Sequence, residues 1–323
     1  MLITLPYGEG NISFELSKKY DVARLARPAR LHAVNLAREL VRVLENPVKT
    51  ESFFKLYRKA SRVTILISDL TRPGASNLLG VLLSLIEKEG MENREVKVVI
   101  ATGMHRPATS EELEAHFGSK LLSRWSFIHH DPRNSKFLKR VGLSNRGTPY
   151  EFSTHVVNAD LVVAIGAVSL HYFAGFGGGR KLILPGVASE ETILANHRLS
   201  LMDDPADGLS YGCEPGNLEG NPVHEDMISS IRFLKAQLFA INYICDDTGD
   251  IVFLNSGDIE TSHREACREY LKLFSIRLRK KYRCAVISAG GAPKDINLLQ
   301  AHKAIRAISY VLCLLYTSPS PRD

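Results

Sequence analysis

The chain has 323 residues, of which 45% are hydrophobic and 24% are charged, so it can bury one large core or two ordinary ones. Its longest apolar run, residues 161–170, reaches only about half a membrane span, and the N-terminus lacks the basic and apolar regions of a secretory signal. These features argue against a membrane-spanning segment, and we expect a cytoplasmic protein with no membrane partner.

The net charge of +6 does not by itself predict a nucleic-acid-binding protein. The basic residues are spread along the chain, and the densest cluster, residues 277–283, is expected to close a helix, where cations complement the helix dipole. No nucleic-acid-binding module is recognisable. The five cysteines are scattered without a CxxC pair, which argues against a disulfide framework and a thiolate zinc site. We therefore expect anionic small molecules, and no nucleic acid, as partners.

After an N-terminal strand and a helix over residues 32–45, the sequence alternates short β-rich runs, polar turns and helical patterns. The first strand is expected at residues 63–67 and its helix at 76–88. The second strand is expected at residues 96–100, with a helix after a capping box at 109–112. The third strand is expected at residues 160–165, with a helix after an N-cap at Ser189. Residues 203–221 are typical of a surface loop, residues 253–258 of a strand end, and residues 262–281 of a helix.

Apolar strands that alternate with helices predict an α/β fold, in which a mainly parallel sheet carries helices on both faces. We expect this N-terminal domain, the cofactor-binding catalytic one, to occupy residues 1–275. A new β-turn unit from Arg283 onward indicates the beginning of a second α/β domain at residues 276–312. Residues 313–323 form no credible strand or helix, and we expect a non-native tail on a C-terminally truncated chain.

Polar side chains follow the predicted strands at the point where each strand ends. Asp69 and Arg72 follow the first strand of the alternating series, His105 follows the second and His171 the third. Because ligands of parallel α/β sheets bind beyond the carboxyl ends of the strands, we expect these four residues along one rim of the sheet.

A glycine-rich loop between His171 and His197 carries the densest chemistry of the chain. Four glycines (Gly175, Gly177, Gly178 and Gly179) precede the Arg180–Lys181 pair. The loop matches neither a Walker A loop, which needs Ser or Thr after the lysine, nor the dinucleotide fingerprint, whose third glycine is replaced by Arg180. What remains is a donor-rich loop suited to a phosphate or carboxylate, with a plain tight turn as the alternative.

Residue chemistry alone leaves several roles open. His105 and His171 suit proton transfer near neutral pH, with a satisfied polar contact as the alternative. Asp69 and Arg72 form either a local ion pair or a site whose arginine binds a substrate carboxylate. His197, in the middle of a predicted helix, is by itself more typical of a helix surface or core than of a metal ligand.

Several ordered motifs together resemble the nickel-pincer lactate racemase family. They are Ser-Asp-Leu-Thr-Arg-Pro at residues 68–73, Ala-Thr-Gly-Met-His-Arg-Pro at 101–107, His-His-Asp-Pro at 129–132, the loop at 171–181 and Asn-His at 196–197. The resemblance covers nearly all of residues 1–310 and implies two α/β domains with the active site between them. It also implies a nickel pincer nucleotide, a pyridinium mononucleotide whose thioamide and thiocarboxylate arms bind nickel through two sulfurs and a ring carbon.

Carried over to matching positions, the resemblance implies a role for each site residue. Lys181 would tether the cofactor covalently, His197 would be the protein ligand of nickel, and His105 and His171 would be the paired catalytic bases. Residues that would contact the cofactor are Asp69, Leu70, Thr71, Arg72, Lys181 and His197. Residues that would bind the substrate are Arg72, Gln300 and Lys303.

The implied activity is racemisation or epimerisation at C2 of a small 2-hydroxy acid, with lactate as the default, by proton-coupled hydride transfer to and from the tethered cofactor. Implied partners are this substrate and the biosynthetic proteins that supply the cofactor. The alternatives are a racemase of another 2-hydroxy acid, an inactive truncated fragment that binds the cofactor, and a nicotinamide-dependent dehydrogenase, which would require the missing dinucleotide fingerprint.

Overall fold

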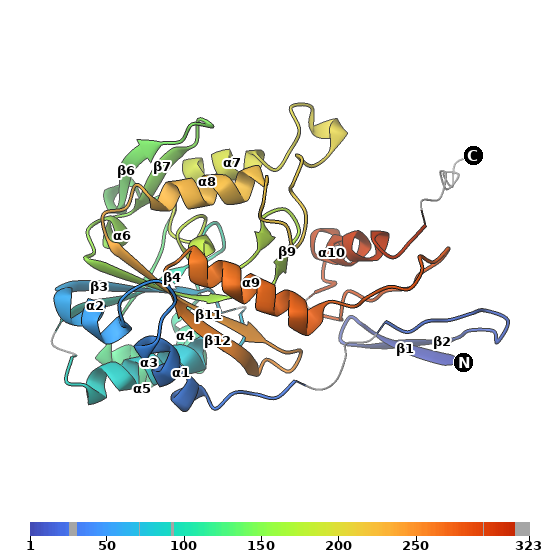
Figure 1. Cartoon of the computed structure of the whole chain (residues 1–323), viewed down its shortest axis with the longest axis horizontal. Coiled ribbons are helices and arrows are strands. Elements are labelled where there is room, and N and C mark those ends of the chain that lie inside the picture. Colours follow the sequence, from blue (N-terminus) through green and yellow to red (C-terminus); the bar gives the residue numbers. More distant parts are fainter. Residues whose placement is uncertain (26–30, 71, 92–93, 293, 314–323) are drawn as a thin grey trace. The chain divides into compact units, whose positions relative to one another are not determined.

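A computed structural model describes residues 1–25, 31–70, 72–91, 94–292 and 294–313, without the side chains of residues 205 and 299 (Figure 1). The chain forms two compact units, which are Arg30–Leu273, and Met1–Ala29 together with Phe274–Asp323. The domain limits expected from the sequence stay a prediction, and Thr71 and nearly all of the expected tail lie outside the described residues.

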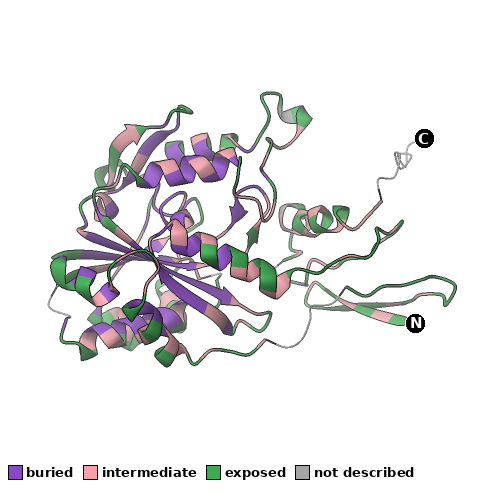
Figure 2. Cartoon of the chain, in the orientation of Figure 1, coloured by how far each residue is buried: buried purple, intermediate pink, exposed green. Residues whose placement is uncertain are grey.

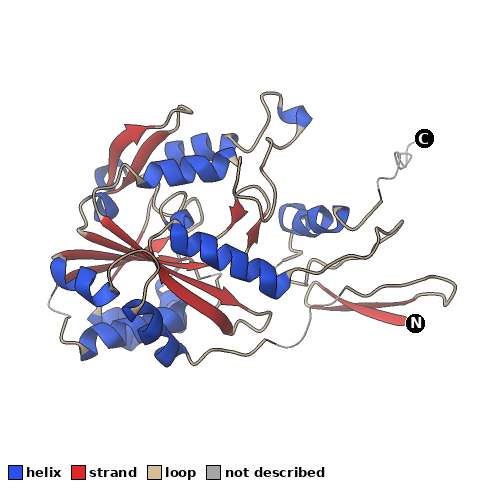
Figure 3. Cartoon of the chain, viewed as in Figure 1, coloured by secondary structure: helices blue, strands red, loops and turns tan. Residues whose placement is uncertain are grey.

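The larger unit is organised around a mainly parallel sheet, which confirms the predicted α/β fold (Figures 1 and 3). Among the described residues, its strands lie in the order β12-β11-β8-β3-β4-β5. Their bounds are β3 (Arg62–Ser68), β4 (Glu95–Ala101), β5 (Ser126–His129), β8 (Leu161–Ala167), β11 (Gln237–Cys245) and β12 (Ile251–Gly257). β12 pairs antiparallel with β11, whereas the other neighbouring strands pair in parallel.

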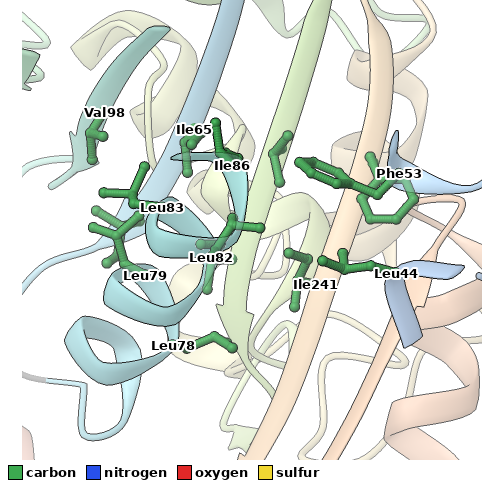
Figure 4. Packing of buried hydrophobic residues seen from close by; sticks show 14 of the residues in the cluster. Leu44, Phe53, Ile65, Leu78, Leu79, Leu82, Leu83, Ile86, Val98 and Ile241 are labelled. Atoms are coloured by element: carbon green, nitrogen blue, oxygen red, sulfur yellow. The ribbon is translucent and has the colours of Figure 1, made fainter. Parts of the chain in front are cut away.

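Both faces of this sheet are buried, because side chains of a strand alternate between faces and both sets are apolar here. In β3, Val63, Ile65 and Ile67 belong to one buried cluster and Leu66 belongs to the other. The strands are buried through the centre of the unit (Figure 2). Figure 4 shows α3 leucines packed beside Ile65 in the first cluster. Burial on both faces explains why the strands appear in the sequence as continuous apolar runs.

Each face carries its own helices (Figure 3). The first cluster includes α1 (Leu36–Glu45), α2 (Phe53–Lys59), α3 (Ala75–Lys88), α4 (Ser110–Phe117) and α5 (Ser119–Arg124). The second includes α6 (Thr154–Val157), the 3₁₀ turn η2 (Gly179–Leu182), α7 (Glu190–Arg198) and α8 (Pro222–Ile231). Outside the main sheet lie the hairpins β6 (Leu138–Leu143) with β7 (Pro149–Ser153) and β9 (Leu170–His171) with β10 (Gly175–Phe176), the 3₁₀ turns η1 (Ser135–Phe137) and η3 (Pro205–Asp207), and α9 (Thr261–Phe274).

The neighbouring strands β3 and β8 send the chain to opposite faces of the sheet. β3 leads into α3 on the face of the first cluster, whereas β8 leads through β9 and β10 to η2 and α7 on the face of the second. The two strands pair directly, with Ile67 opposite Ile165 near their carboxyl ends. Such a divergence is the topological switch point at which open α/β sheets bind ligands.

Two helix starts confirm the capping signals of the sequence. Thr109 Oγ1 accepts a hydrogen bond from the Glu112 amide at 3.2 Å, and the Glu112 carboxylate accepts one from the Thr109 amide at 2.8 Å. Ser189 Oγ accepts from the Thr192 amide at 3.3 Å. These bonds satisfy amides that a helix leaves unpaired in its first turn. α1, however, begins at Leu36 and not at His32.

Other expectations were wrong. α9 ends at Phe274 and not at residue 281, so the basic cluster at 277–283 follows the helix and does not close it. In residues 277–283 positive charges follow one another, and this segment already belongs to the other compact unit. The strand expected from Arg283 is absent from the described residues, where this stretch has one bridge, between Tyr282 and Leu312. A strand needs partners along its length to satisfy its backbone groups.

The smaller unit contains a hairpin and a helix. Strands β1 (Leu2–Tyr7) and β2 (Gly10–Glu15) pair antiparallel, and α10 (Leu298–Ser309) begins after Asn297, whose side chain accepts from the Gln300 amide at 2.9 Å. The Gly8 amide donates to Asp295 at 2.8 Å, which connects the hairpin with the segment before α10. Neither unit contains, within its described residues, a helix long and apolar enough to cross a membrane.

Gly166 of β8 provides a test of how the glycine-rich loop packs on the sheet. A Cβ at Gly166 would lie 2.7 Å from the Gly179 amide nitrogen and 2.8 Å from Gly178 Cα. We expect Gly166→Ala to lower the free energy of unfolding by about 1–3 kcal/mol, the usual cost of overpacking a core. Urea unfolding measures the effect. Gly80→Ala in α3 is the matched control, since its Cβ would meet Leu121 at an ordinary 3.7 Å, and equal stability of the two variants would contradict the expectation.

Candidate active site

The turns after β3 and β4 bring Asp69 and His105 together. Asp69 follows the end of β3, and the His105 amide donates to Thr102 O at 3.0 Å in the turn after β4. The His105 ring places Nδ1 at 2.5 Å from Asp69 Oδ2. The sequence predicted that these residues share one rim, but it did not predict this pair, because the contact joins two different turns.

Asp69 determines the proton state of His105. The carboxylate raises the pKa of His105, against the smaller opposing effects of burial and of the positive charges of Arg72 and Lys181. Because a carboxylate accepts, Nδ1 donates its proton to Asp69 and the neutral ring has its lone pair on Nε2. With 67% of the side chain exposed, this ring can take up a proton at Nε2.

His171 has the opposite arrangement. It lies in the short hairpin of β9 and β10, opposite Gly175, and its Nδ1 accepts a hydrogen bond from the Ala174 amide at 3.2 Å. The proton of the neutral ring therefore lies on Nε2. Burial, followed by the nearby charge of Lys181, lowers the pKa of His171 far below its usual value. His171 is thus a neutral ring whose Nε2–H can donate a hydrogen bond.

His197 lies in the last turn of α7 and not in its middle, as the sequence had suggested. Its Nδ1 donates to Ile193 O at 2.8 Å, which leaves the lone pair on Nε2. Burial, and then the charge of Lys181, lowers the pKa of His197 to about 4. The ring is therefore neutral at physiological pH, as an imidazole must be in order to bind a metal ion.

Phe173 is the common neighbour of three of these groups, and sequence reasoning missed it. Its ring centroid lies 4.6 Å from that of His171 and 5.1 Å from that of His197, edge to face in both cases. Lys181 Nζ lies 5.8 Å from the same ring. With Phe173 only 5% exposed, its ring fixes their spacing. An aromatic residue directly between a histidine and a glycine run was the only signal in the sequence.

Lys181 lies among the three histidines that the sequence had singled out. Its positive charge lowers the pKa of His105, His171 and His197 alike. Arg72 acts on His105 and His171 in the same way. His171, His197 and Lys181 thus meet at the Phe173 ring, and the charges of Lys181 and Arg72 act on His105 as well.

The glycines of the loop have a different role from the expected one. A Cβ at Gly175, where φ is +75°, would lie 2.1 Å from Asn217 O, and one at Gly178 would lie 2.8 Å from a Val168 methyl group. Protein atoms, and not an open anion site, thus fill the space beside these two glycines. Arg180 is fully buried and donates to backbone carbonyls, so it does not present its charge to a ligand beside Lys181.

The remaining predicted site residues are placed as follows. Leu70 packs partly buried against the first apolar cluster, and Thr71 lies outside the described residues. Gln300 and Lys303 belong to the smaller unit, where Lys303 Nζ donates to Gln300 Oε1 at 2.7 Å on one face of α10. Their part in the site stays a prediction. The described residues contain no group of three or more His, Cys, Asp or Glu side chains placed to hold a metal ion.

The fold and the site together are typical of an α/β enzyme, in which titratable groups lie at the switch point of a parallel sheet. Residues 7–209 match the family model described as the lactate racemase N-terminal domain. The chain belongs to the lactate racemase family.

Two relatives and two solved structures show how far the similarity extends. The chain is 37% identical over 309 residues to the lactate racemase of Thermoanaerobacterium thermosaccharolyticum and 29% identical over 307 residues to that of Lactiplantibacillus plantarum, covering 94% of this chain and 70% of each relative. The structure of the Thermoanaerobacterium apoprotein superposes with a TM-score of 0.81 and 32% identity, covering 97% of this chain and 72% of that one. A Thermotoga maritima protein shares the fold alone, at a TM-score of 0.60 and 19% identity, with 77% of this chain and 61% of that chain covered.

The Asp69–His105 pair predicts a change in titration. In Asp69→Asn, the His105 pKa should fall below about 6.5, because burial, Arg72 and Lys181 then act without the carboxylate. The pair stabilises the fold below the unfolded pKa of histidine, and this contribution is lost as the pH rises through the raised folded pKa. NMR titration of the His105 ring measures the shift, with His116 as an internal control whose titration should not change. An unaltered His105 pKa would contradict the assignment.

Proposed function

We propose that the chain is a racemase of a small 2-hydroxy acid, with lactate as the first candidate substrate. The observation that carries the proposal is the group of Lys181, His171 and His197 around Phe173, together with the Asp69–His105 pair on which the Lys181 charge acts. Family membership supports the same reaction. Inversion of a carbon centre needs one group on each side of the substrate, and two imidazoles meet this requirement.

The residues present fit the nickel pincer nucleotide that the resemblance implies. His197 has an unprotonated Nε2 in a neutral ring, suited to a divalent metal, and Lys181 Nζ lies beside the same Phe173 ring as His197. We therefore assign His197 as the protein ligand of nickel and Lys181 as the point of covalent attachment. When bound, the cofactor would supply the site that accepts and returns the C2 hydride.

The two histidines would move the hydroxyl proton. His105, with its lone pair on Nε2, would take the proton from the hydroxyl of one enantiomer, while Asp69 stabilises the imidazolium that forms. His171 would serve the other enantiomer in the same way: it would take the hydroxyl proton and return it from the imidazolium so formed. In the reverse direction the two residues exchange roles. Each ring thus acts as a base when it is neutral and as an acid when it is protonated.

The substrate carboxylate would bind in a positive environment. Arg72 lies close enough to act on the pKa of both histidines, and a guanidinium binds a carboxylate through two parallel hydrogen bonds. Lys303 and Gln300 are the proposed second group of substrate contacts. Holding the carboxylate would restrict reorientation between the two half-reactions to the oxidised carbon and its oxygen.

Covalent attachment can be tested by mass. After loading with cofactor, the intact chain should show a mass adduct that peptide mapping places on Lys181, and Lys181→Ala should carry none, because the substitution removes the amine that lies beside Phe173. Lys136→Ala, at an exposed lysine of η1, is the matched control and should load as the wild type does. A full adduct in Lys181→Ala would contradict the tether.

The two-base assignment predicts that His105→Ala and His171→Ala each reduce racemisation at least about 100-fold, the lower end of what a positioned acid or base contributes. Chiral chromatography of lactate and of other 2-hydroxy acids, starting from each enantiomer, measures the rates and the substrate preference. His116→Ala on α4 serves as the control. A near-normal rate in either variant would exclude a pair of obligatory bases.

A further inference from the structure

Arg180 is a buried cation held by the backbone of the glycine-rich loop. Its side chain has 0% exposure, Nη2 donates to Ala174 O at 2.9 Å and Nη1 to Phe176 O at 3.1 Å. Burial lowers the pKa of Arg180 to about 10, so the guanidinium keeps its charge at neutral pH. Within the described part of the chain, no carboxylate pairs with it.

His263, in the first turn of α9, contacts the same loop from outside. Its ring is fully buried, and Nε2 lies 2.8 Å from Arg180 Nη1 and 2.7 Å from Gly177 O. A Cβ at Gly179 would lie 3.1 Å from the ring, so the imidazole packs flat against the loop backbone. Burial keeps the pKa of His263 well below its usual value, and the ring is neutral. It can therefore accept from Arg180 or donate to Gly177.

Arg180 and His263 together connect the parts of the loop that carry the working groups. The carbonyls bound by Arg180 belong to residues 174 and 176, directly after the stretch that contains His171 and Phe173. The next residue along the chain is Lys181, whose amide donates to Gly178 O at 3.0 Å. Arg180 thus points into the protein while its neighbour Lys181 reaches the Phe173 ring.

An arginine without a carboxylate partner is costly to bury, so its position calls for an explanation beyond stability. The planar guanidinium presents five donors in a fixed geometry and can bind two carbonyls and an imidazole at once, which a lysine or an apolar residue cannot do. Arg180 Nε has no hydrogen-bond partner in the described structure, but Nη1 and Nη2 are bonded on several sides, and such buried bonds favour one conformation of the backbone that they hold. Here that backbone is the loop of His171 and Lys181.

We propose that Arg180 and His263 form a positioning pair, which holds the 171–181 loop in the one conformation that presents His171 and Lys181 to the same site. The inference rests on the proposed function, in that it takes His171 and Lys181 as the working groups. Neither member of the pair touches the substrate. Their effect is transmitted through the loop carbonyls and through the Ala174 amide, which donates to His171 Nδ1.

The test compares His263→Gln with His263→Leu, and Arg180→Lys with Arg180→Met. Gln can supply an acceptor to Arg180 and should retain wild-type behaviour, whereas Leu removes it. His224→Leu is the matched control, because His224 is a buried histidine on α8 whose ring nitrogens have no hydrogen-bond partner in the described structure. Thermal unfolding identifies variants that fold, and only these are compared.

Two readouts report on the loop itself. The ¹⁵N signature of His171, with a proton on Nε2 and an acceptor at Nδ1, should be lost in His263→Leu and Arg180→Met and kept in His263→Gln and His224→Leu. Cofactor loading at Lys181, read by peptide mass, should fall at least about 10-fold in the same two variants, as for other residues that orient metal-site groups. Arg180→Lys cannot make all the bonds of Arg180 at once and should lose both readouts too, so it and the two His263 variants still decide the matter if Arg180→Met fails to fold.

A double variant distinguishes two residues that act as a pair from two residues that contribute separately to cofactor loading. The double variant Arg180→Met/His263→Leu should load about as poorly as the worse single variant, because the second substitution removes nothing further. If the loss of loading in the double variant equals the product of the two single losses, the pairing is overturned. Unchanged His171 signature and loading in folded variants would overturn the positioning role while leaving the proposed function intact. Loss of the His171 signature, with no adduct in the wild type either, would support the pair and refute the tether.

Discussion

The parallel pairing of β3 with β8 is the constraint on which the rest of the molecule depends. Because these neighbours lead to opposite faces of the sheet, the turns after them separate and leave room at the sheet edge. The turn after β3 brings Asp69 and Arg72 to that edge, and the segment after β8 brings His171 and Lys181. Residues distant in sequence thus meet because the order of the strands brings their turns together.

The site combines two imidazoles with opposite surroundings. His105 is exposed and bonded to a carboxylate, which favours its protonated form, whereas His171 is buried among positive charges, which favour its neutral form. In a reaction that must run in both directions, such a difference favours His105 as the ring that holds the extra proton and His171 as the ring that starts neutral. Phe173 has a separate part, since it keeps His171, His197 and Lys181 at set spacings without taking or giving a proton.

The sequence revealed whatever depends on local patterns. Apolar runs identified β3, β4 and β8, and capping residues identified the starts of α4 and α7. Position after a strand also placed four polar residues on one rim. Contacts between distant segments had no local signal: the bond of Asp69 to His105, the burial of Arg180 and its meeting with His263 depend on how turns and helices pack. The end of α9 was missed for the same reason, because neighbouring structure and not propensity decides where it stops.

The close packing of the glycine-rich loop on β8 has a consequence for attempts to redesign the enzyme. A side chain at Gly166 in β8 would meet the backbone of Gly178 and Gly179, and a side chain at Gly178 would meet Ala167 and Val168. Mutagenesis libraries directed at this loop should therefore yield mostly misfolded protein and few altered specificities. The side chain of His105 is 67% exposed. The turn that carries it should therefore tolerate more substitutions, among which new substrate preferences can be found.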